Sequence, residues 1–185
     1  MDIEKKQIFF RKRLIEETEF AGGVPHGISR RYRQDGTLLW SANFKQGKLH
    51  GESKGYYANG KVSSQVSFNE GKREGKALFF AKDGPQVLQE LFYKDGLLEG
   101  LQKIYYKGGA LQGELSYQKG VLSGPIKLYF PNGQIMREMT LVAARRQGLD
   151  TLWDSTGSIA FSLEYDRGRF TKAFIEDTIA KVYQL

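Results

Sequence analysis

Hydrophobic and polar residues alternate along short stretches of this chain, and turn residues separate the stretches. In residues 109–117, GALQGELSY, the side chains of Leu111, Leu115 and Tyr117 share one parity, and polar side chains fill the other. Residues 133–141, GQIMREMTL, alternate in the same way, except that Arg137 falls among the apolar positions. A period of two over seven residues predicts half-buried β-strands.

The glycines that bound these stretches recur at a fixed interval, which indicates a repeat. Opening glycines stand 24 or 25 residues apart, an aromatic residue follows each after five residues, and a second glycine follows after nine. The opening glycines are Gly27, Gly51, Gly75, Gly100, Gly124 and Gly148, and the aromatic residues are Tyr32, Tyr56, Phe80, Tyr105, Tyr129 and Trp153. A third glycine closes five of the six units, and Ala144 takes its place in the remaining one.

The second glycine often follows Asn or Asp, as in Asn59-Gly60 and Asn132-Gly133. These dipeptides favour a two-residue type I′ turn, because both central residues of that turn need positive φ. Each unit is therefore predicted to be a β-hairpin, with another glycine-containing turn leading into the next unit.

The length of this loop determines which residues face each other across the hairpin. An even loop places the residue three past the opening glycine opposite the residue fourteen past it. Lys103 then faces Glu114 and Lys127 faces Glu138, whereas a three-residue loop would break both pairs. Because opposite charges across a ladder are favourable, we predict the even loop.

The predicted fold is all-β: a single elongated, twisted antiparallel sheet of repeated hairpins over residues 1–169. A half-unit covers 1–26, and six units begin at 27, 51, 75, 100, 124 and 148. Residues 170–185 contain no turn glycine, and their apolar residues fit a helical spacing. This segment is predicted to be a capping helix, with a further strand pair as the alternative.

Composition narrows the possible classes of function. The 185 residues include 22 glycines and no cysteine, which excludes disulfides, thiolate nucleophiles and cysteine-ligated zinc. The N-terminal region lacks the apolar run of a secretory signal, so a cytoplasmic location is expected. The net charge of +7 is compatible with a nucleic acid, an anionic membrane or an acidic protein as partner.

The pattern offers little catalytic chemistry. His26 and His50 each precede an opening glycine, so both are interpreted as turn residues rather than metal ligands. The sequence contains no nucleophile elbow, phosphate-binding loop or paired histidine and carboxylate. We expect no enzymatic activity, no metal and no cofactor.

Binding to a partner is the remaining class of function, and the face that carries the recurring aromatic residues is the candidate surface. Tyrosine, tryptophan and arginine are typical of binding hot spots. The candidate partner-binding residues are Arg30, Tyr32, Lys54, Tyr56, Phe80, Lys103, Tyr105, Lys127, Tyr129, Trp153, Arg145 and Arg146. The alternative is that the aromatic residues only pack. Two units are irregular, one through an extra residue near Pro85 and one through Ala144 and the Arg145-Arg146 pair.

The pattern G-x4-[YF]-x3-G-x-[LIV]-x5-[YF]-x2-G over roughly residues 14–168 resembles MORN-variant repeats, as found in bacterial antitoxins of the YwqK type. The resemblance implies an immunity protein that binds a cognate secreted toxin, such as a nuclease, and neutralises it by direct occlusion. The alternative is a peripheral membrane or scaffold module that binds anionic lipid or other proteins. Stable binding to nucleic acid is the weakest possibility, and both monomer and dimer stay open.

Overall fold

A computed structural model describes residues 2–174, and every regular element in this range is a β-strand. The all-β prediction is confirmed. The chain divides into two compact units, residues 1–97 and 98–185. No helix long and apolar enough to cross a membrane occurs among the described residues.

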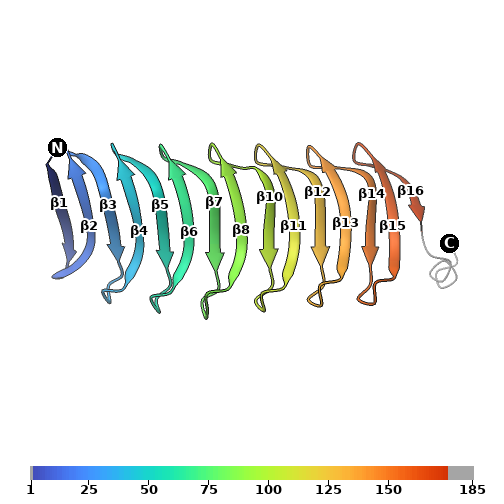
Figure 1. The fold of residues 1–185 in the computed structure, drawn as a ribbon, viewed down its shortest axis with the longest axis horizontal. Coiled ribbons are helices and arrows are strands. Elements are labelled where there is room, and N and C mark those ends of the chain that lie inside the picture. The colour runs from blue at the N-terminus through green and yellow to red at the C-terminus, as the bar shows by residue number, and fades with distance from the viewer. Residues whose placement is uncertain (1, 175–185) are drawn as a thin grey trace. The chain divides into compact units, whose positions relative to one another are not determined.

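The first unit is an antiparallel sheet in which each strand pairs with the next one along the chain (Figure 1). Its strands are β1 (Ile3–Phe10), β2 (Arg13–Ala21), β3 (Val24–Tyr32), β4 (Leu38–Lys45), β5 (Lys48–Tyr56), β6 (Val62–Asn69), β7 (Lys72–Phe80) and β8 (Val87–Lys94). A two-residue strand, β9 (Leu97–Leu98), spans the division between the units.

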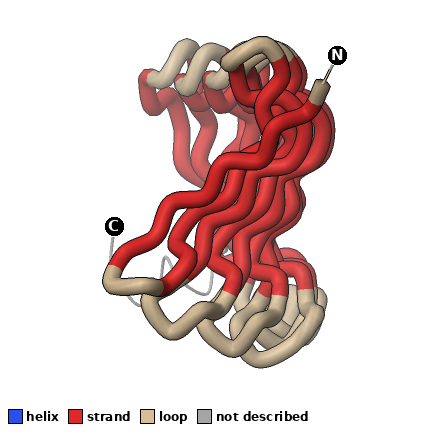
Figure 2. Tube along the Cα trace, turned by 90° about the vertical axis from the view of Figure 1, so that its left-hand side faces the viewer, coloured by secondary structure: helices blue, strands red, loops and turns tan. Residues whose placement is uncertain are grey.

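The second unit repeats the same architecture, again with antiparallel pairs of consecutive strands. Its strands are β10 (Gly100–Tyr105), β11 (Leu111–Gln118), β12 (Val121–Tyr129), β13 (Ile135–Val142), β14 (Arg145–Trp153), β15 (Ile159–Asp166) and β16 (Arg169–Phe174). Figure 2 shows the strands in red and the connecting turns in tan at the ends of the strands.

The turns at the third glycine have type I′ geometry. Asn69 pairs with Lys72, which leaves a two-residue loop, Glu70-Gly71, whose φ angles are 47° and 84°. Positive φ at both central residues defines this turn and matches the twist of the flanking strands. The equivalent Ala144 adopts a φ of 61° without being glycine.

The turns at Asn-Gly are one residue longer than predicted. The Gly60 N–H donates to the Tyr57 carbonyl at 3.0 Å, and the Tyr57 N–H donates to the Lys61 carbonyl at 2.8 Å. Of the loop residues 58–60, only Gly60 has positive φ, at 80°. This is a three-residue loop that ends in a glycine bulge, so the type I′ prediction at this glycine is wrong.

The predicted register is nevertheless correct. Lys103 faces Glu114, and Lys127 faces Glu138. A β-bulge in the second strand of the hairpin compensates for the odd loop; in β11 the extra residue is Gln112, which has no partner in β10. A bulge adds one residue to one strand, and the second odd residue restores the parity that the loop had shifted.

Buried side chains form a row across the strands of each unit, two residues after the opening glycine. This position is no more than 7 % exposed in all six units; it holds Ser29, Ser53, Ala77, Gln102, Ile126 and Asp150. These residues lie within strands and share a face with the residues they pair with, as Ser29 and Ser53 both do with Ala42. The core of the sheet is therefore narrow, and small side chains fill much of it.

The prediction for the C-terminal segment is wrong in its described part. Residues 170–174 belong to strand β16, which pairs with β15, and are not helical. Phe170 and Phe174 continue an edge strand beside Tyr165 and Ser162. The remaining residues of the predicted helix, 175–185, lie outside the described residues.

Ala144→Gly is expected to stabilise the second unit by about 1 kcal/mol. A left-handed conformation costs a residue with a Cβ roughly 1–2 kcal/mol, and glycine avoids this cost. The free energy of urea-induced unfolding measures the gain. As a matched control, Gly71→Ala should destabilise the first unit by a similar amount, and an unchanged stability in both variants would contradict the turn geometry.

Candidate functional site

The recurring aromatic and basic residues lie half-buried on one face of the strands, which we call the aromatic face. It is formed by the residues three and five positions after each opening glycine. In the first unit these include Arg30, Tyr32, Lys54, Tyr56 and Phe80; in the second they include Lys103, Tyr105, Lys127, Tyr129 and Trp153.

The cations of this face in the first unit are already paired. Arg30 Nη1 lies 2.9 Å from Glu17 Oε1, and Lys54 Nζ lies 2.6 Å from Glu52 Oε2. The hydrogen bond from Arg30 holds the pKa of Glu17 below its usual value, and the bond to Glu52 raises the pKa of Lys54. Each positive charge is therefore largely compensated within the sheet.

The second unit shows the same compensation. Lys103 Nζ lies 3.7 Å from Glu114 Oε1, and Lys127 Nζ lies 3.1 Å from Glu138 Oε1. These residues occupy one cross-strand row in which positive and negative side chains alternate from β10 to β13. The row supports strand register, and it leaves little surplus charge for a partner.

Two tyrosines of the aromatic face are anchored through their hydroxyls. Tyr32 Oη donates to Glu17 Oε1 at 3.0 Å, and Tyr129 Oη donates to Glu114 Oε2 at 2.9 Å. Burial, followed by the bond to Glu114, raises the pKa of Tyr129 to about 12. At these two positions, the aromatic residues fit the alternative that they pack within the sheet rather than bind a partner.

Between pH 9 and 12, the free energy of unfolding of Tyr129→Phe is expected to fall less than that of the unmodified protein. The folded pKa of Tyr129 lies above the unfolded value, so its contribution is fully present below pH 10 and is lost as pH rises through 12. After allowance for solvent screening, this contribution is about 1–2 kcal/mol. Urea unfolding of both proteins at several pH values between 9 and 12 measures it. Parallel pH profiles of the two proteins would contradict the role of the hydroxyl.

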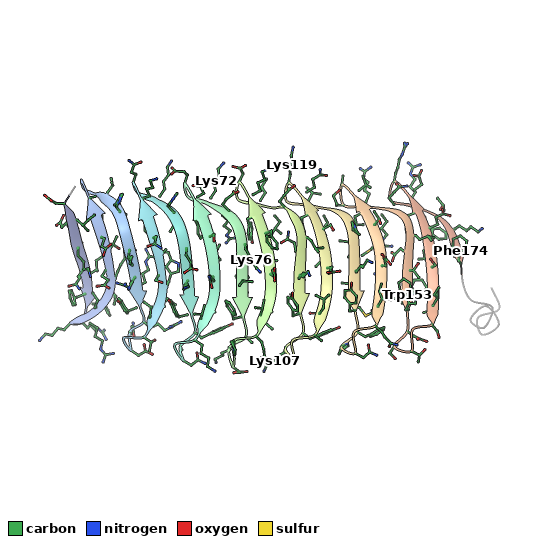
Figure 3. All side chains as sticks on the ribbon, in the orientation of Figure 1. Lys72, Lys76, Lys107, Lys119, Trp153 and Phe174 are labelled. Carbon is green, nitrogen blue, oxygen red and sulfur yellow. The ribbon has the colours of Figure 1, made fainter. Side chains whose placement is uncertain are left out.

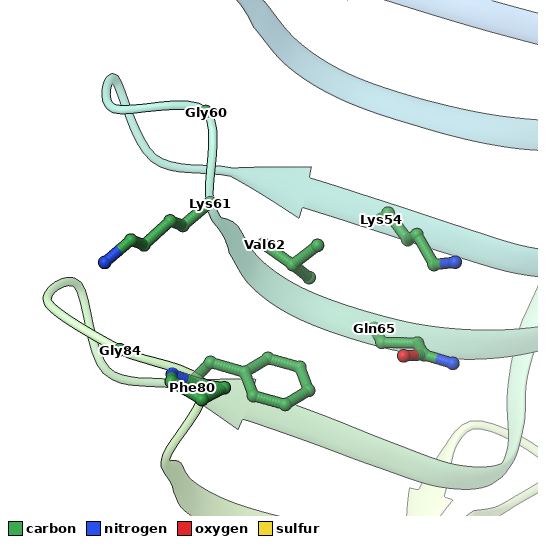
Figure 4. A pocket seen from close by; sticks show the side chains of 8 residues that line it. Lys54, Gly60, Lys61, Val62, Gln65, Phe80 and Gly84 are labelled. Atoms are coloured by element: carbon green, nitrogen blue, oxygen red, sulfur yellow. The ribbon is translucent and has the colours of Figure 1, made fainter.

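Phe80 differs from these tyrosines because it has no hydroxyl that could anchor it, and it lines a cavity of about 540 Å³. Figure 4 shows the ring beside Val62, with Lys54 and Gln65 at one end and the Gly60 and Gly84 turns at the other. The lining residues are Lys54, Gly60, Lys61, Val62, Gln65, Phe80, Gly84 and Pro85. We call this cavity the Phe80 pocket.

The irregularity of the third repeat explains why a pocket opens here. The Ala81 N–H donates to the Gln86 carbonyl at 2.8 Å, so this turn is one residue longer than the turn closed by Tyr57 and Lys61. Gly84 and Pro85 of this longer turn line the pocket together with the Phe80 ring.

Polar groups hold the walls of the Phe80 pocket in place. The Gln65 amide nitrogen donates to Glu52, which also pairs with Lys54. Lys61 Nζ donates to the Asp83 carbonyl at 2.6 Å, and Tyr57 Oη donates to the Phe80 carbonyl at 2.7 Å. The pocket therefore combines an apolar floor with a fixed polar rim that includes two lysines.

The other candidates of the first unit line separate hollows. Arg30, Lys54 and Tyr56 border one of about 230 Å³, and Tyr32 lines one of about 530 Å³ together with Phe10. The structure thus brings Lys54 and Phe80 into one pocket, to which Tyr32 contributes nothing. Sequence reasoning missed Val62, which faces Tyr56, and Gln65, which faces Lys54, although the register makes both positions available.

The Arg145-Arg146 pair does not join the aromatic face. Arg146 lies 3.3 Å from the buried Asp150 and donates to Tyr165 Oη at 2.6 Å, so it is committed to the opposite face. Arg145 is exposed at the turn that follows Val142. Figure 3 shows the side chains along the strands and at the turns.

Arg137, which interrupts the alternation, has a partner that the sequence pattern did not reveal. Its Nε and Nη2 atoms donate to the two carboxylate oxygens of Asp150 at 2.7 and 2.6 Å. Asp150 is 1 % exposed and belongs to the buried row. Arg137 faces Leu152 directly, and Asp150 lies two residues before Leu152 in β14. The charge of Arg137, at a position where apolar residues are expected, is thus compensated by this diagonal neighbour.

Within residues 2–174, no three histidine, cysteine, aspartate or glutamate side chains gather closely enough to hold a metal ion. His50 Nδ1 is buried without a hydrogen-bond partner and lies 3.9 Å from Glu70 Oε1. His50 lies within strand β5 and His26 lies within β3, so the interpretation of both as turn residues is wrong.

Comparison with known proteins identifies the repeat. The family model described as "MORN repeat variant" matches residues 49–70, 98–119 and 122–142. No curated protein matches the chain. Among solved structures, a protein of unknown function from Bacteroides fragilis is 8 % identical, with 96 % of this chain and 94 % of that chain covered at a TM-score of 0.15. A score this low does not establish a common fold.

Proposed function

Since this chain is a MORN-variant repeat protein, we propose that it is a non-enzymatic binding protein of the immunity type, which neutralises a cognate toxin by covering it. The Phe80 pocket is the observation that carries this proposal. A toxin segment inserts an apolar side chain into the pocket, and the surrounding aromatic face supplies the contact area.

The pocket has the properties of a protein-binding hot spot. Its floor is an aromatic ring beside Val62 and Pro85, and its rim offers Lys54, Lys61 and Gln65 as hydrogen-bond donors. Energetic hot spots of interfaces are apolar, water-excluding pockets with a polar border. Because strands and fixed hydrogen bonds hold these walls, little conformational entropy is lost on binding.

The charge pairing favours a protein partner over an anionic membrane. Lipid binding through basic residues requires a surplus of positive charge at the surface. On the aromatic face, Arg30 and Lys54 each lie within 3 Å of a carboxylate oxygen. The lysines of the second unit are paired as well, so this face is patterned rather than uniformly basic.

Affinity capture from the source organism tests the proposal. At roughly 0.5 M salt the Debye length is only a few Å, so contacts that rest on surface charge alone are suppressed. We expect one stoichiometric protein partner that is toxic when expressed alone and harmless when coexpressed. Recovery of the protein only with anionic vesicles at low salt, and with no protein partner, would instead support the peripheral membrane alternative.

A further inference from the structure

Ion pairs connect consecutive type I′ turns in the first unit. A lysine begins the strand after one turn, and an acidic residue is the first residue of the next turn. Lys48 Nζ lies 3.3 Å from Glu70 Oε2, and Lys72 Nζ lies 3.4 Å from Asp95 Oδ1. The repeat geometry therefore brings these two positions within ion-pairing distance.

Arg145 occupies the same position in the second unit. A Cβ built on Gly71 would lie 4.0 Å from Lys48 Cβ, and a Cβ built on Gly168 would lie 3.3 Å from Arg145 Cβ. The turn contact also recurs, because the Gly168 N–H donates to the Arg146 carbonyl at 2.8 Å, as the Gly71 N–H does to the Leu49 carbonyl.

The acid of this pair is replaced by a second arginine, Arg167. Among the described residues, no carboxylate oxygen lies within 4 Å of the guanidinium nitrogens of Arg145 or Arg167. The nearest acid in sequence, Asp166, accepts a hydrogen bond from the Gln147 amide at 3.2 Å instead. Two cations thus stand where two repeats of the first unit place a cation and an anion.

The two arginines line one cavity of about 300 Å³ with Val142, Ala143 and Gln147. Val142 is 55 % exposed, and with Ala143 it gives the cavity an apolar wall. Gln147 is fixed by its bonds to Asp166 and to the Arg167 N–H. The cavity therefore places two arginine side chains beside an apolar surface at the Arg167-Gly168 turn.

We propose that the Arg145–Arg167 cavity binds a carboxylate carried on an apolar stem, as presented by an acidic side chain or the C-terminal residue of a protein. The carboxylate takes the place that Glu70 and Asp95 occupy in the first unit. Guanidinium groups bind carboxylates through paired, charge-assisted hydrogen bonds. The apolar wall favours this ligand over phosphate, which has no apolar part to bury.

This site lies on different residues from the Phe80 pocket and does not depend on the proposed function. Titration of the full chain with N-acetyl-leucine, followed by backbone amide NMR, tests it directly. We expect saturable shifts of the amides at 142–147 and 166–168, and binding of the neutral N-acetyl-leucinamide at least about tenfold weaker, the size of effect that one charge-assisted hydrogen bond produces. Equal binding of the two compounds would overturn the proposal.

Arg167→Glu provides a variant that removes the site and preserves the fold. It restores the ion pair of the first unit, so the thermal stability should be equal or higher, while the affinity for N-acetyl-leucine should fall at least about tenfold. The matched variant Glu70→Arg creates an equivalent cation pair with Lys48 and should gain weak binding. Unchanged affinity in Arg167→Glu, or tighter binding of inorganic phosphate than of N-acetyl-leucine, would contradict the assignment.

Discussion

Asp150→Ala is expected to lower the free energy of unfolding of the second unit by about 3–5 kcal/mol. Asp150 is 1 % exposed and accepts two hydrogen bonds from Arg137, with Arg146 3.3 Å away. Its removal leaves the Arg137 guanidinium partly buried without a carboxylate, and an uncompensated buried charge costs far more than a lost surface ion pair. The hydrogen bond to Asp150 raises the pKa of Arg137, so this arginine stays charged.

Urea unfolding followed by Trp153 fluorescence measures this effect in a Trp40→Phe background, where Trp153 is the sole tryptophan. The double variant Asp150→Ile with Arg137→Leu is the control, because it replaces both charges by apolar groups. It should recover most of the lost stability, since a buried ion pair contributes little net free energy. A cost below 1 kcal/mol for Asp150→Ala alone would show that Arg137 does not depend on this carboxylate.

Ile126→Ala is expected to destabilise the second unit by about 2–4 kcal/mol. Ile126 is 2 % exposed and lies in the buried row between Leu115 and Met139. Shortening this side chain loses its transfer free energy and leaves a cavity that the sheet closes only in part.

The same strand supplies a control for Ile126→Ala. Val121 is 45 % exposed, so Val121→Ala should change the unfolding free energy by less than about 0.5 kcal/mol. Ala77 occupies the equivalent position of another repeat, and there Ala77→Ile should be destabilising through overpacking. Similar costs for Ile126→Ala and Val121→Ala would contradict the placement of the core.

Periodicity was sufficient to predict the strands and their pairing. Glycine spacing located the turns, and the facing charges of Lys103 and Glu114 fixed the register. The type I′ turn was predicted at the wrong glycine, because Asn-Gly suits both a type I′ turn and a three-residue loop that ends in glycine. The bulge at Gln112 makes the longer loop compatible with the register, but no residue type in the sequence marks its position.

The buried row was harder to predict, because burial on a sheet depends on neighbouring strands as much as on residue type. Ser29, Ser53 and Gln102 are polar residues that pattern analysis assigns to solvent. Ser29 and Ser53 have a paired strand on each side, and polar groups there form bonds such as that between Ser29 Oγ and Thr18 Oγ1 at 2.7 Å.

The candidate site was predicted only in part for the same reason. The aromatic position of each unit was visible in the sequence, but its environment was not. Tyr129 is anchored to Glu114, whereas Phe80 lines a pocket together with Gly84 and Pro85 of the longer turn. One inserted residue changes the geometry of a repeat more than its residue pattern suggests.

The affinity of the captured partner for two glycine variants tests the binding role of the Phe80 pocket most directly. Gly84→Trp places a large side chain at the pocket, and its Cβ meets nothing closer than Gln86 Oε1, at 3.5 Å. Gly108→Trp makes the same change in the corresponding turn of the second unit, where a Cβ has no neighbour within 4 Å. Neither glycine has positive φ, so both variants should fold.

Calorimetric titration of the partner into each variant gives the answer. We expect Gly84→Trp to weaken binding at least about 100-fold, the effect of losing a hot spot worth roughly 3 kcal/mol, whereas Gly108→Trp should bind like the unmodified protein. Equal affinity of the two variants would contradict binding through the Phe80 pocket.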